Sequence, residues 1–466
     1  MTIESEEEEV LIQEEAISPA RHLEKKALKG TYYIIIFYAI ANALRLVSSI
    51  VLTHLFTPDY FGVMQLMTVV LVGLTLFSHI GLGDSVIQSP RGDEPVFLNT
   101  VWTLQVMRGV GLWLMTLLLA WPVAIFYRES RIIWLLPVLG FGCVIAGFSS
   151  TSLLSLSRHM GIGKTSSQEL LSQAVQFVVT IIWAKIQPSL WALVAGRIAS
   201  EVFRTVFSYF IMPELRPRFT WDKECVRAIL GFGKWIMLGS ALAFLAQQSD
   251  RLILGKLIPI VALGVYGIAY GLSDLPRNII SMFTSRVGYP FIAKFAQRPR
   301  EEYRAIVLKY RRPILAVGGL LLICMINLGD VFVLHVYKKP YHDASWMVCI
   351  LAAGLWHTLL YSTSNQAILA LGKAHYSASS NLVYCIGLFV LIPVGFHFYG
   401  IAGAVIAVAI SDVPVYFVIL HAAYREKVGM FFQDLWMTAG FATALGATLF
   451  LRVLLGFGLP FHGIHS

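Results

Sequence analysis

Long apolar runs, separated by short polar segments, follow one another along almost the whole chain. They recur nearly back to back from Gly30 to Gly456. The hydrocarbon core of a membrane is about 30 Å thick, and about 20 apolar residues of helix cross it. The pattern predicts thirteen spans, at residues 31–54, 60–80, 98–122, 132–156, 167–187, 189–212, 229–249, 260–285, 313–336, 345–371, 375–397, 399–423 and 431–455.

The two ends of the chain differ from this pattern. Residues 1–29 form an acidic tail that begins MTIESEEEEVLIQEE and ends in a segment, Pro19 to Lys29, typical of a short amphipathic helix. A signal peptide begins with basic residues, so we do not expect a cleavable signal here. At the other end Arg452 lies in the last turn of the thirteenth run. That run either crosses the membrane or lies along its surface.

The composition excludes a soluble protein. The chain has 466 residues, of which 57% are hydrophobic and 14% are charged, whereas soluble domains carry about 25% charged residues. The five cysteines show no CxxC spacing and no Cys/His cluster, so we expect no metal and no cofactor. No P-loop pattern occurs, which excludes ATP as an expected energy source. Nucleic acid is not an expected partner.

Basic residues predict the orientation. With the N-terminus in the cytoplasm, the inner loops hold 22 lysines and arginines and the outer loops hold 7. Inner loops are enriched in basic residues in membrane proteins. We therefore expect a cytoplasmic N-terminus.

A weak internal repeat predicts two halves. LFTPDYFGV (Leu55 to Val63) follows the first span and LIPIVALGV (Leu257 to Val265) follows the seventh, so Gly62 and Gly264 are 202 positions apart. A Gly-Lys pair recurs 209 positions apart, at Gly163 and Gly372. Halves of like orientation are related by an axis along the membrane normal. The predicted fold is all-α and polytopic, with an N-lobe at 30–212, a linker at 213–228, a C-lobe at 229–424 and one additional helix and tail at 425–466.

Arginines inside the predicted spans are the candidate chemistry of the first half. A guanidinium is costly in lipid, so these side chains should face protein or water. Arginine binds phosphate through paired hydrogen bonds and keeps its charge when partly desolvated. The candidate head-group contacts are Arg45, Arg108, Arg197, Glu201 and Arg204, of which the last three share one helical face. The alternative is that they reach the interface or form structural ion pairs.

Polar and aromatic residues in the second half are the remaining candidates. Gln247 belongs to a group with Gln248, Asp250 and Arg251 that we expect to close span seven at the outer face. Tyr266, Tyr270, Asp274 and Arg277 share one face of span eight and are candidates to contact sugar, or form a self-satisfied polar seam. Asp412 in span twelve is a weak candidate to bind a coupling proton or sodium ion, or is a structural acid.

Four motifs, in this order and at these places relative to the spans, resemble a known family. They are LFTPDYFGVMQL, GLGDSVIQ (Gly81 to Gln88), QQSDRLILGKL with LGVYGIAYGL (Gln247 to Leu272), and YGIAGAVIA (Tyr399 to Ala407). This chain resembles the Wzx-type polysaccharide-transport flippases of the multidrug/oligosaccharidyl-lipid/polysaccharide exporter superfamily. The resemblance implies translocation of undecaprenyl-pyrophosphate-linked oligosaccharide across the bacterial inner membrane, for exopolysaccharide, capsule or O-antigen, by two lobes that open alternately. The implied partners are that lipid-linked glycan, membrane lipids, and a polymerase and glycosyltransferases of the same pathway.

Other functions remain open at this stage. A lipid II flippase differs from this prediction only in the sugars of its cargo. A drug or cation antiporter of the same fold should carry acidic rather than basic residues within its spans. A membrane-embedded polymerase or ligase generally has a sizeable outer loop, whereas the longest one predicted here, Tyr337 to Ser345, is short. We therefore predict a transporter and not an enzyme.

Overall fold

The computed structural model describes residues 36–158, 162–211 and 217–461, and this part of the chain forms helices and no strands. The predicted acidic tail and amphipathic segment lie outside the described residues. The first group of helices comprises the N-terminal helix (Ile36–Leu55), α2 (Pro58–Phe77), α3 (Leu82–Gln88), α4 (Pro95–Tyr127), α5 (Ile132–Gly147), α6 (Ser152–Arg158), α7 (Ile162–Ile186) and α8 (Leu190–Ile211).

The second group continues the chain. It comprises α9 (Lys223–Leu257), α10 (Ile260–Ser273), α11 (Leu275–Phe283), the short π-helix η1 (Thr284–Gly288), α12 (Tyr289–Ala293), α13 (Arg300–Val336), the 3₁₀ turn η2 (Lys339–Tyr341), α14 (Ala344–Ala370), α15 (Ala374–Ile410), α16 (Val413–Arg425) and α17 (Phe431–Leu454).

These helices make a multi-pass membrane protein. Among the described residues, eight helices or runs of helices are long and apolar enough to cross a bilayer: Ile36–Leu55, Pro58–Gln88, Pro95–Tyr127, Lys164–Ile186, Arg300–Val336, Lys339–Ala370, Ala374–Arg425 and Phe431–Leu454. Two shorter apolar helices, Ile132–Gly147 and Ile260–Ser273, coincide with predicted spans.

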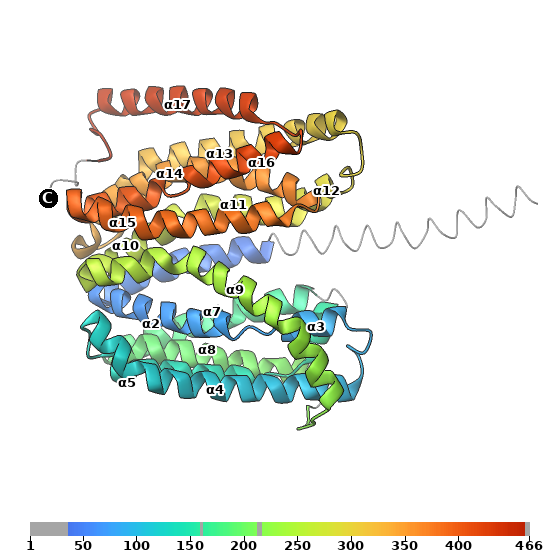
Figure 1. The fold of residues 1–466 in the computed structure, drawn as a ribbon. Coiled ribbons are helices and arrows are strands. Elements are labelled where there is room, and N and C mark those ends of the chain that lie inside the picture. The colour runs from blue at the N-terminus through green and yellow to red at the C-terminus, as the bar shows by residue number, and fades with distance from the viewer. Residues whose placement is uncertain (1–35, 159–161, 212–216, 462–466) are drawn as a thin grey trace, which may run out of the picture.

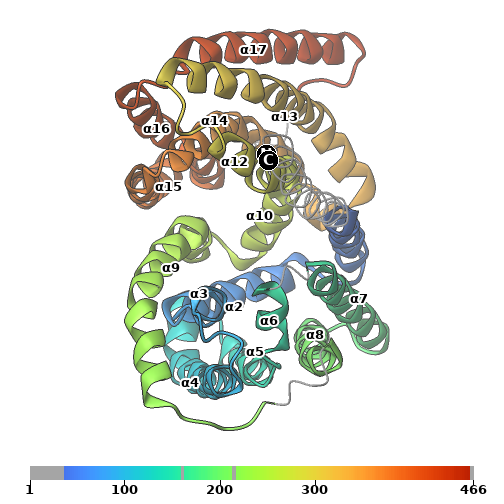
Figure 2. The same cartoon turned by 90° about the vertical axis from the view of Figure 1, so that its right-hand side faces the viewer.

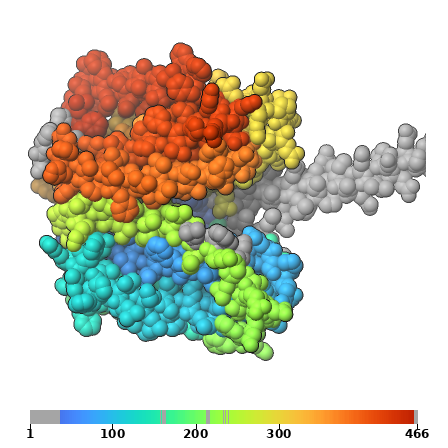
Figure 3. Space-filling model, viewed as in Figure 1, coloured from blue at the N-terminus to red at the C-terminus, as the bar shows by residue number. Residues whose placement is uncertain are grey.

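The helices pack mainly within their own group. In the first group α4 packs on α5 and α7 on α8, and in the second α13 and α15 both pack on α14. α9 and α10 link the groups, since α9 packs on α2 and α15 and α10 packs on α2. The space-filling view shows these yellow-green helices between the blue-to-cyan and the orange-to-red parts of the molecule (Figure 3).

The contact between α2 and α10 depends on two glycines. A Cβ on Gly62 would overlap the carbonyl oxygen of Ile260, and a Cβ on Gly264 would overlap that of Pro58. Pro58 and Ile260 are 202 positions apart, as are the two glycines, so the overlaps are reciprocal. The Gln65 amide also donates to the carbonyl of Leu263, at 3.1 Å. Any larger residue at either glycine would push the two helices apart.

Further bonds between the groups lie at this same end of the molecule. The Tyr341 hydroxyl donates to the carbonyl of Phe56, at 2.9 Å. Ser49 and the Tyr337 hydroxyl share a hydrogen bond of 3.3 Å, and the Lys338 ammonium donates to the carbonyl of His54. We call this end, where α2 begins, the closed end.

The structure corrects several predicted boundaries. α9 begins at Lys223, inside the predicted linker, because the Asp222 carboxylate accepts hydrogen bonds from two amides of its first turn. It then runs to Leu257, beyond the predicted end at 249. By contrast, the predicted boundary between spans eleven and twelve is confirmed, because Tyr399 and Gly400 are non-helical and break α15 at that point; span twelve continues through α16. Gly400 has φ +58°, a backbone region that glycine adopts without strain.

α17 lies alongside α13 as the outermost helix of the second group (Figures 1 and 2). Near its start, Asp434 pairs with the fully buried Arg311 of α13 at 2.8 Å. Near its end, Arg452 pairs with Asp330 of α13. The paired residues are 18 and 19 positions apart along their helices, which is about 27–29 Å at 1.5 Å per residue. The two pairs therefore hold α17 alongside α13 over this length, and both helices are long and apolar enough to cross a bilayer.

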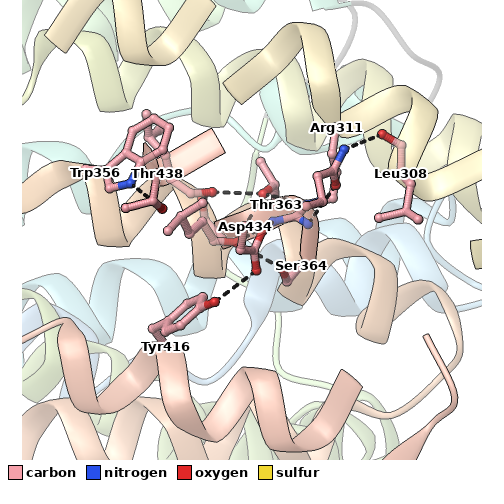
Figure 4. A network of polar contacts seen from close by, with 12 residues as sticks. Leu308, Arg311, Trp356, Thr363, Ser364, Tyr416, Asp434 and Thr438 are labelled. Atoms are coloured by element: carbon pink, nitrogen blue, oxygen red, sulfur yellow. Dashed lines mark hydrogen bonds and ion pairs between the residues drawn. The ribbon is translucent and has the colours of Figure 1, made fainter. Parts of the chain in front are cut away.

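The pair at the start of α17 belongs to a larger polar network (Figure 4). The Arg311 guanidinium also donates to Thr363 at 3.0 Å and to the carbonyl of Leu360 at 3.0 Å. The Tyr416 hydroxyl donates to the other oxygen of Asp434 at 3.1 Å. Every charged atom of this buried pair therefore has polar partners, as burial of charge requires.

Candidate functional site

A cavity of about 740 Å³ lies within the first group of helices, away from the closed end. Its lining residues come from α2 to α8 and the turns between them. Its charged lining consists of Arg108, Arg197, Glu201 and Arg204. Three guanidinium groups against one carboxylate leave a net positive cavity, which is suited to an anion. The polar lining is completed by Thr68, Thr75, His79, Gln105, Cys143, Ser149, Gln168 and Gln176.

Arg108 projects from the middle of α4 toward α2. Its Nη2 donates to the carbonyl of Thr75 at 2.7 Å, and its Nε donates to the Ser78 hydroxyl at 3.1 Å. Both acceptors are neutral, so these bonds orient the guanidinium without neutralising its charge. The nearby Gln105 amide donates hydrogen bonds to carbonyls at the end of α5, including that of Gly147 at 3.0 Å.

Glu201 lies between two arginines on one face of α8. Its carboxylate is 3.2 Å from Arg197 and 3.9 Å from Arg204. The glutamate side chain is 12% exposed, whereas the two arginines are 53% and 49% exposed. Glu201 is thus largely covered while both guanidinium groups still face the cavity. The predicted shared face of this helix is what the structure shows, and one positive charge remains in excess.

Arg45 is not among the residues that line this cavity. It projects from the N-terminal helix toward Glu169 of α7, at 3.6 Å, and both side chains are more than half exposed. Glu169 follows Gln168, which does line the cavity. Arg45 therefore lies beside the cavity, near its α7 wall, and not with the other arginines.

Four candidates of the second group lie in a polar seam: Tyr266, Tyr270, Asp274 and Arg277. The Tyr266 hydroxyl donates to Asp250 at 2.7 Å, and Arg277 pairs with Asp274 at 2.6 Å and donates to the Tyr270 hydroxyl at 3.2 Å. Tyr266 is fully buried. In this conformation the Tyr266 hydroxyl is buried and hydrogen-bonded to Asp250, so it is not free to contact sugar.

One expectation about this part of the chain needs correction. Asp250 and Arg251 do not close a helix at the outer face, because α9 continues six residues beyond Arg251 to Leu257. Asp250 is instead a buried acid with one oxygen that lacks a hydrogen-bond partner. Gln247, by contrast, is exposed.

Asp412 lies at the junction of α15 and α16 and is 8% exposed. It accepts a hydrogen bond from Thr358 of α14. Among the described residues, no group of three or more histidine, cysteine or acidic side chains is arranged to hold a metal ion.

The structure also shows a polar cluster that the pattern of apolar runs did not predict. Asp59, within the LFTPDYFGV motif, pairs with Arg131 at 2.8 Å, and Arg131 pairs with Glu129 at 2.8 Å. The hydrogen bonds from Arg131 hold the pKa of Glu129 below its usual range. This cluster connects the start of α2 to the loop before α5 at the closed end. Its one signal in the sequence was Asp59, an acidic residue within a mostly apolar motif.

Comparison with known proteins places the chain in a family. Residues 51–345 match the family model described as "Polysaccharide biosynthesis protein". Similar proteins include the teichuronic acid biosynthesis protein TuaB of Bacillus subtilis, 22% identical over 69% of this chain and 68% of TuaB. The lipopolysaccharide biosynthesis protein WzxC of Escherichia coli is 22% identical over 89% of this chain and 85% of WzxC.

Solved structures give the same fold. An inward-facing multidrug resistance MATE family transporter of the MOP superfamily aligns with TM-score 0.66 and 14% identity, over 85% of this chain and 98% of that one. The lipid II flippase MurJ in an inward closed conformation aligns with TM-score 0.66 and 12% identity, over 90% and 92%. The chain thus has the helical exporter fold of these transporters, and it belongs to the polysaccharide biosynthesis protein family.

Proposed function

We propose that this protein is a flippase that moves undecaprenyl-pyrophosphate-linked oligosaccharide repeat units across the bacterial inner membrane for surface polysaccharide synthesis. The observation that carries the proposal is the positive cavity formed by Arg108, Arg197 and Arg204 inside a membrane bundle. A pyrophosphate dianion needs paired donors in a partly desolvated setting, which guanidinium groups provide. The names of the teichuronic acid biosynthesis protein TuaB and the lipopolysaccharide biosynthesis protein WzxC support the same class of cargo.

The proposed mechanism is alternating access by two pseudo-symmetric lobes. The reciprocal overlaps of Gly62 with Ile260 and Gly264 with Pro58 support it, since a two-fold axis makes residue i meet j wherever j meets i. With the N-terminus in the cytoplasm, as the basic loops favour, the closed end lies outside and the cavity lies in the cytoplasmic half. The cargo then enters from the cytoplasm, and separation of α2 from α10 releases it outward.

The membrane potential assists this direction of transport. Because the inside is negative, outward movement of negative charge is favourable by about 2.3 kcal/mol per charge per 100 mV. Asp412, with Thr358 as its partner, is the proposed site at which a proton or sodium ion is coupled to the cycle. The exposed Gln247 and the pair of Asp274 with Arg277 are proposed as contacts for the glycan.

The cavity charge argues against the antiporter alternative. A cationic drug would meet three guanidinium groups and one carboxylate, and like charge opposes its entry. A lipid II flippase remains the second candidate, since its cargo differs from this one only in its sugars. The two differ in the glycan, so export assays with each lipid-linked sugar separate them.

The test is replacement of Arg108. Hydrogen bonds to charged groups contribute about 1.5–3 kcal/mol each, so Arg108→Ala should weaken head-group binding about 10- to 150-fold. Export of polymer should fall accordingly, while the amount of protein in the membrane stays unchanged. Arg298→Ala, which removes an exposed arginine paired with Glu302, is the control and should export normally. Normal export by the Arg108 variant would refute the role of the cavity.

A further inference from the structure

The second group of helices carries a strongly basic surface at the end of the molecule opposite the closed end. It is formed by η1, α12, the first third of α13 and the chain around the ends of α14 and α16. Its charged residues, all exposed or half-buried, are Arg286, Lys294, Arg298, Arg300, Arg304, Lys309, Arg312, Lys373, Arg425, Lys427, Glu301, Glu302 and Glu426. Ten basic residues against three acidic ones give it a net charge of +7. We call it the basic surface.

Packing holds the segments of the basic surface together. Ile292 of α12, Val307 of α13, Ala367 of α14 and Val428 after α16 belong to one buried apolar cluster. The Tyr303 hydroxyl of α13 donates to the carbonyl of Ala367 at 2.7 Å. The charges therefore lie on packed helices and not on separate loops, so their potentials add.

Little of this charge is neutralised within the protein. Glu426 is 4.0 Å from Arg300 and 3.7 Å from Lys373, and Arg298 pairs with Glu302 at 3.5 Å. Among the described residues, no acidic side chain forms an ion pair with the other seven basic residues, Arg286, Lys294, Arg304, Lys309, Arg312, Arg425 and Lys427.

The same end of the first group is closer to balance. Its loops and outermost helix turns carry six basic and four acidic described residues: Arg91, Arg158, Lys164, Arg218, Lys223, Arg227, Asp93, Glu94, Asp222 and Glu224. Arg91 is 2.8 Å from Glu94, and Arg158 is 3.0 Å from Asp93. A bilayer presents the same headgroups to both groups, so an excess of charge on one of them points to a more local anion.

The chain itself contains an anion of matching charge. Its first 15 residues include seven glutamates and no lysine, arginine or histidine. The 20 residues between them and Ile36 reach at most about 70 Å when extended and about 30 Å as a helix. The N-terminal helix begins at the same end as α12 (Figure 1), and its Tyr38 hydroxyl donates to the carbonyl of Asn278 in α11, shortly before η1. The basic surface is therefore within reach of the glutamates.

We propose that the glutamate-rich segment Glu4 to Glu15 of this chain binds the basic surface. The inference goes beyond the proposed function and does not depend on it. Seven carboxylates match the net charge of +7, and a tether of this length gives them an effective concentration of about millimolar. Exposed ion pairs are individually weak and are screened by salt, so several act together at that concentration. The bound segment excludes other polyanions from the surface.

Two glutamines provide matched positions for reporters. Gln297 lies between Lys294 and Arg298 on the basic surface, and Gln88 ends α3 at the same end of the first group. Both are exposed. Gln297→Cys and Gln88→Cys, each made in the full chain, therefore add a thiol without changing the charge. The native Cys143 lines the positive cavity and reports on that compartment.

The experiment follows labelling of each thiol by an uncharged, water-soluble maleimide in phosphatidylcholine nanodiscs. The comparison variant has all seven tail glutamates changed to glutamine, which alters no described residue. At about 0.01 M salt, where the Debye length is about 30 Å, the native tail should slow labelling of Gln297→Cys at least about twofold, the value for half-occupancy. The difference should vanish at about 1 M salt, where that length is about 3 Å. Labelling of Gln88→Cys and Cys143 should not depend on the tail.

Four results would overturn the inference. Equal labelling of Gln297→Cys with either tail means that the segment does not bind there. A tail effect at Cys143 alone places the segment in the positive cavity. Equal tail effects at Gln297→Cys and Gln88→Cys indicate a general field and not a binding surface. Protection that requires added phosphatidylglycerol and occurs with either tail assigns the surface to lipid headgroups.

A matched pair of lysine variants provides a second measurement. Lys294→Gln with Lys309→Gln removes two charges from the basic surface and should reduce protection of Gln297→Cys by the native tail. Lys164→Gln with Lys223→Gln removes two exposed lysines from the same end of the first group and should leave that protection unchanged. Equal effects of the two double variants would mean that net charge alone matters, which contradicts a defined binding surface.

Discussion

The closed end should open when a single methyl group is added between α2 and α10. In Gly264→Ala the new Cβ would overlap the carbonyl oxygen of Pro58 and approach the Gly62 amide nitrogen to 3.0 Å. A backbone oxygen cannot rotate away as a side chain can, so the helices must separate. Overpacking of this kind costs about 1–3 kcal/mol. Since about 1.4 kcal/mol corresponds to a tenfold change, the closed state should lose about 5- to 150-fold in population relative to the opened one.

The assay is the exposure of the helix interface. Leu263 is fully buried in this contact, so a cysteine in its place reports opening through its reaction with a water-soluble maleimide. Cys143 and Cys324 are replaced by serine for this measurement. Gly271→Ala is the control, because a Cβ on that α10 glycine meets nothing within 4 Å. Both variants gain the same helix propensity relative to glycine, so the difference between them isolates the contact.

Reciprocity makes the test stricter. Gly62→Ala should open the same interface, because its Cβ would overlap the carbonyl of Ile260. The double variant should cost less than the two single changes together, since helices already separated have no second clash. If cysteine 263 in Gly264→Ala reacts no faster than in Gly271→Ala, α2 and α10 are not the moving contact and the reasoning fails.

The remaining predictions concern the two ends of the molecule. Asp434→Ala leaves the fully buried Arg311 without its ion-pair partner and should lower the free energy of unfolding by about 3–5 kcal/mol. Chemical denaturation in detergent measures this loss. A smaller loss in the double variant Arg311→Met/Asp434→Leu would confirm that the unpaired charge is responsible. At the closed end, the hydrogen bonds from Arg131 lower the pKa of Glu129, so the stabilising contribution of Glu129 is present at neutral pH and is lost as pH falls through its folded-state pKa. Glu129→Gln should therefore reduce the loss of unfolding free energy at acid pH. An unchanged loss would exclude this pair as its cause.

Local periodicity explains what sequence reasoning placed correctly. The apolar runs predicted the eight long apolar segments and the two shorter apolar helices of the described residues, because each span must satisfy its own backbone within lipid, a property of the segment alone. The shared face of Arg197, Glu201 and Arg204 also followed from helix geometry, since i, i+4 and i+7 lie on one side of any α-helix. Boundaries were less accurate: α9 gains its start from Asp222, a cap outside the apolar pattern.

Relations between distant segments were decided by the tertiary structure alone. The chain order did not show that Arg108 of α4 faces the same cavity as Arg197 of α8 while Arg45 turns toward Glu169. Nor did it pair Arg311 with Asp434 or Arg452 with Asp330, the two contacts that hold the last helix alongside α13. The sequence by itself determined which segments are helical and apolar, because that depends on neighbouring residues. Which charges meet depends on how helices pack, since each helix can present a charge to several neighbours and only the assembled bundle selects one.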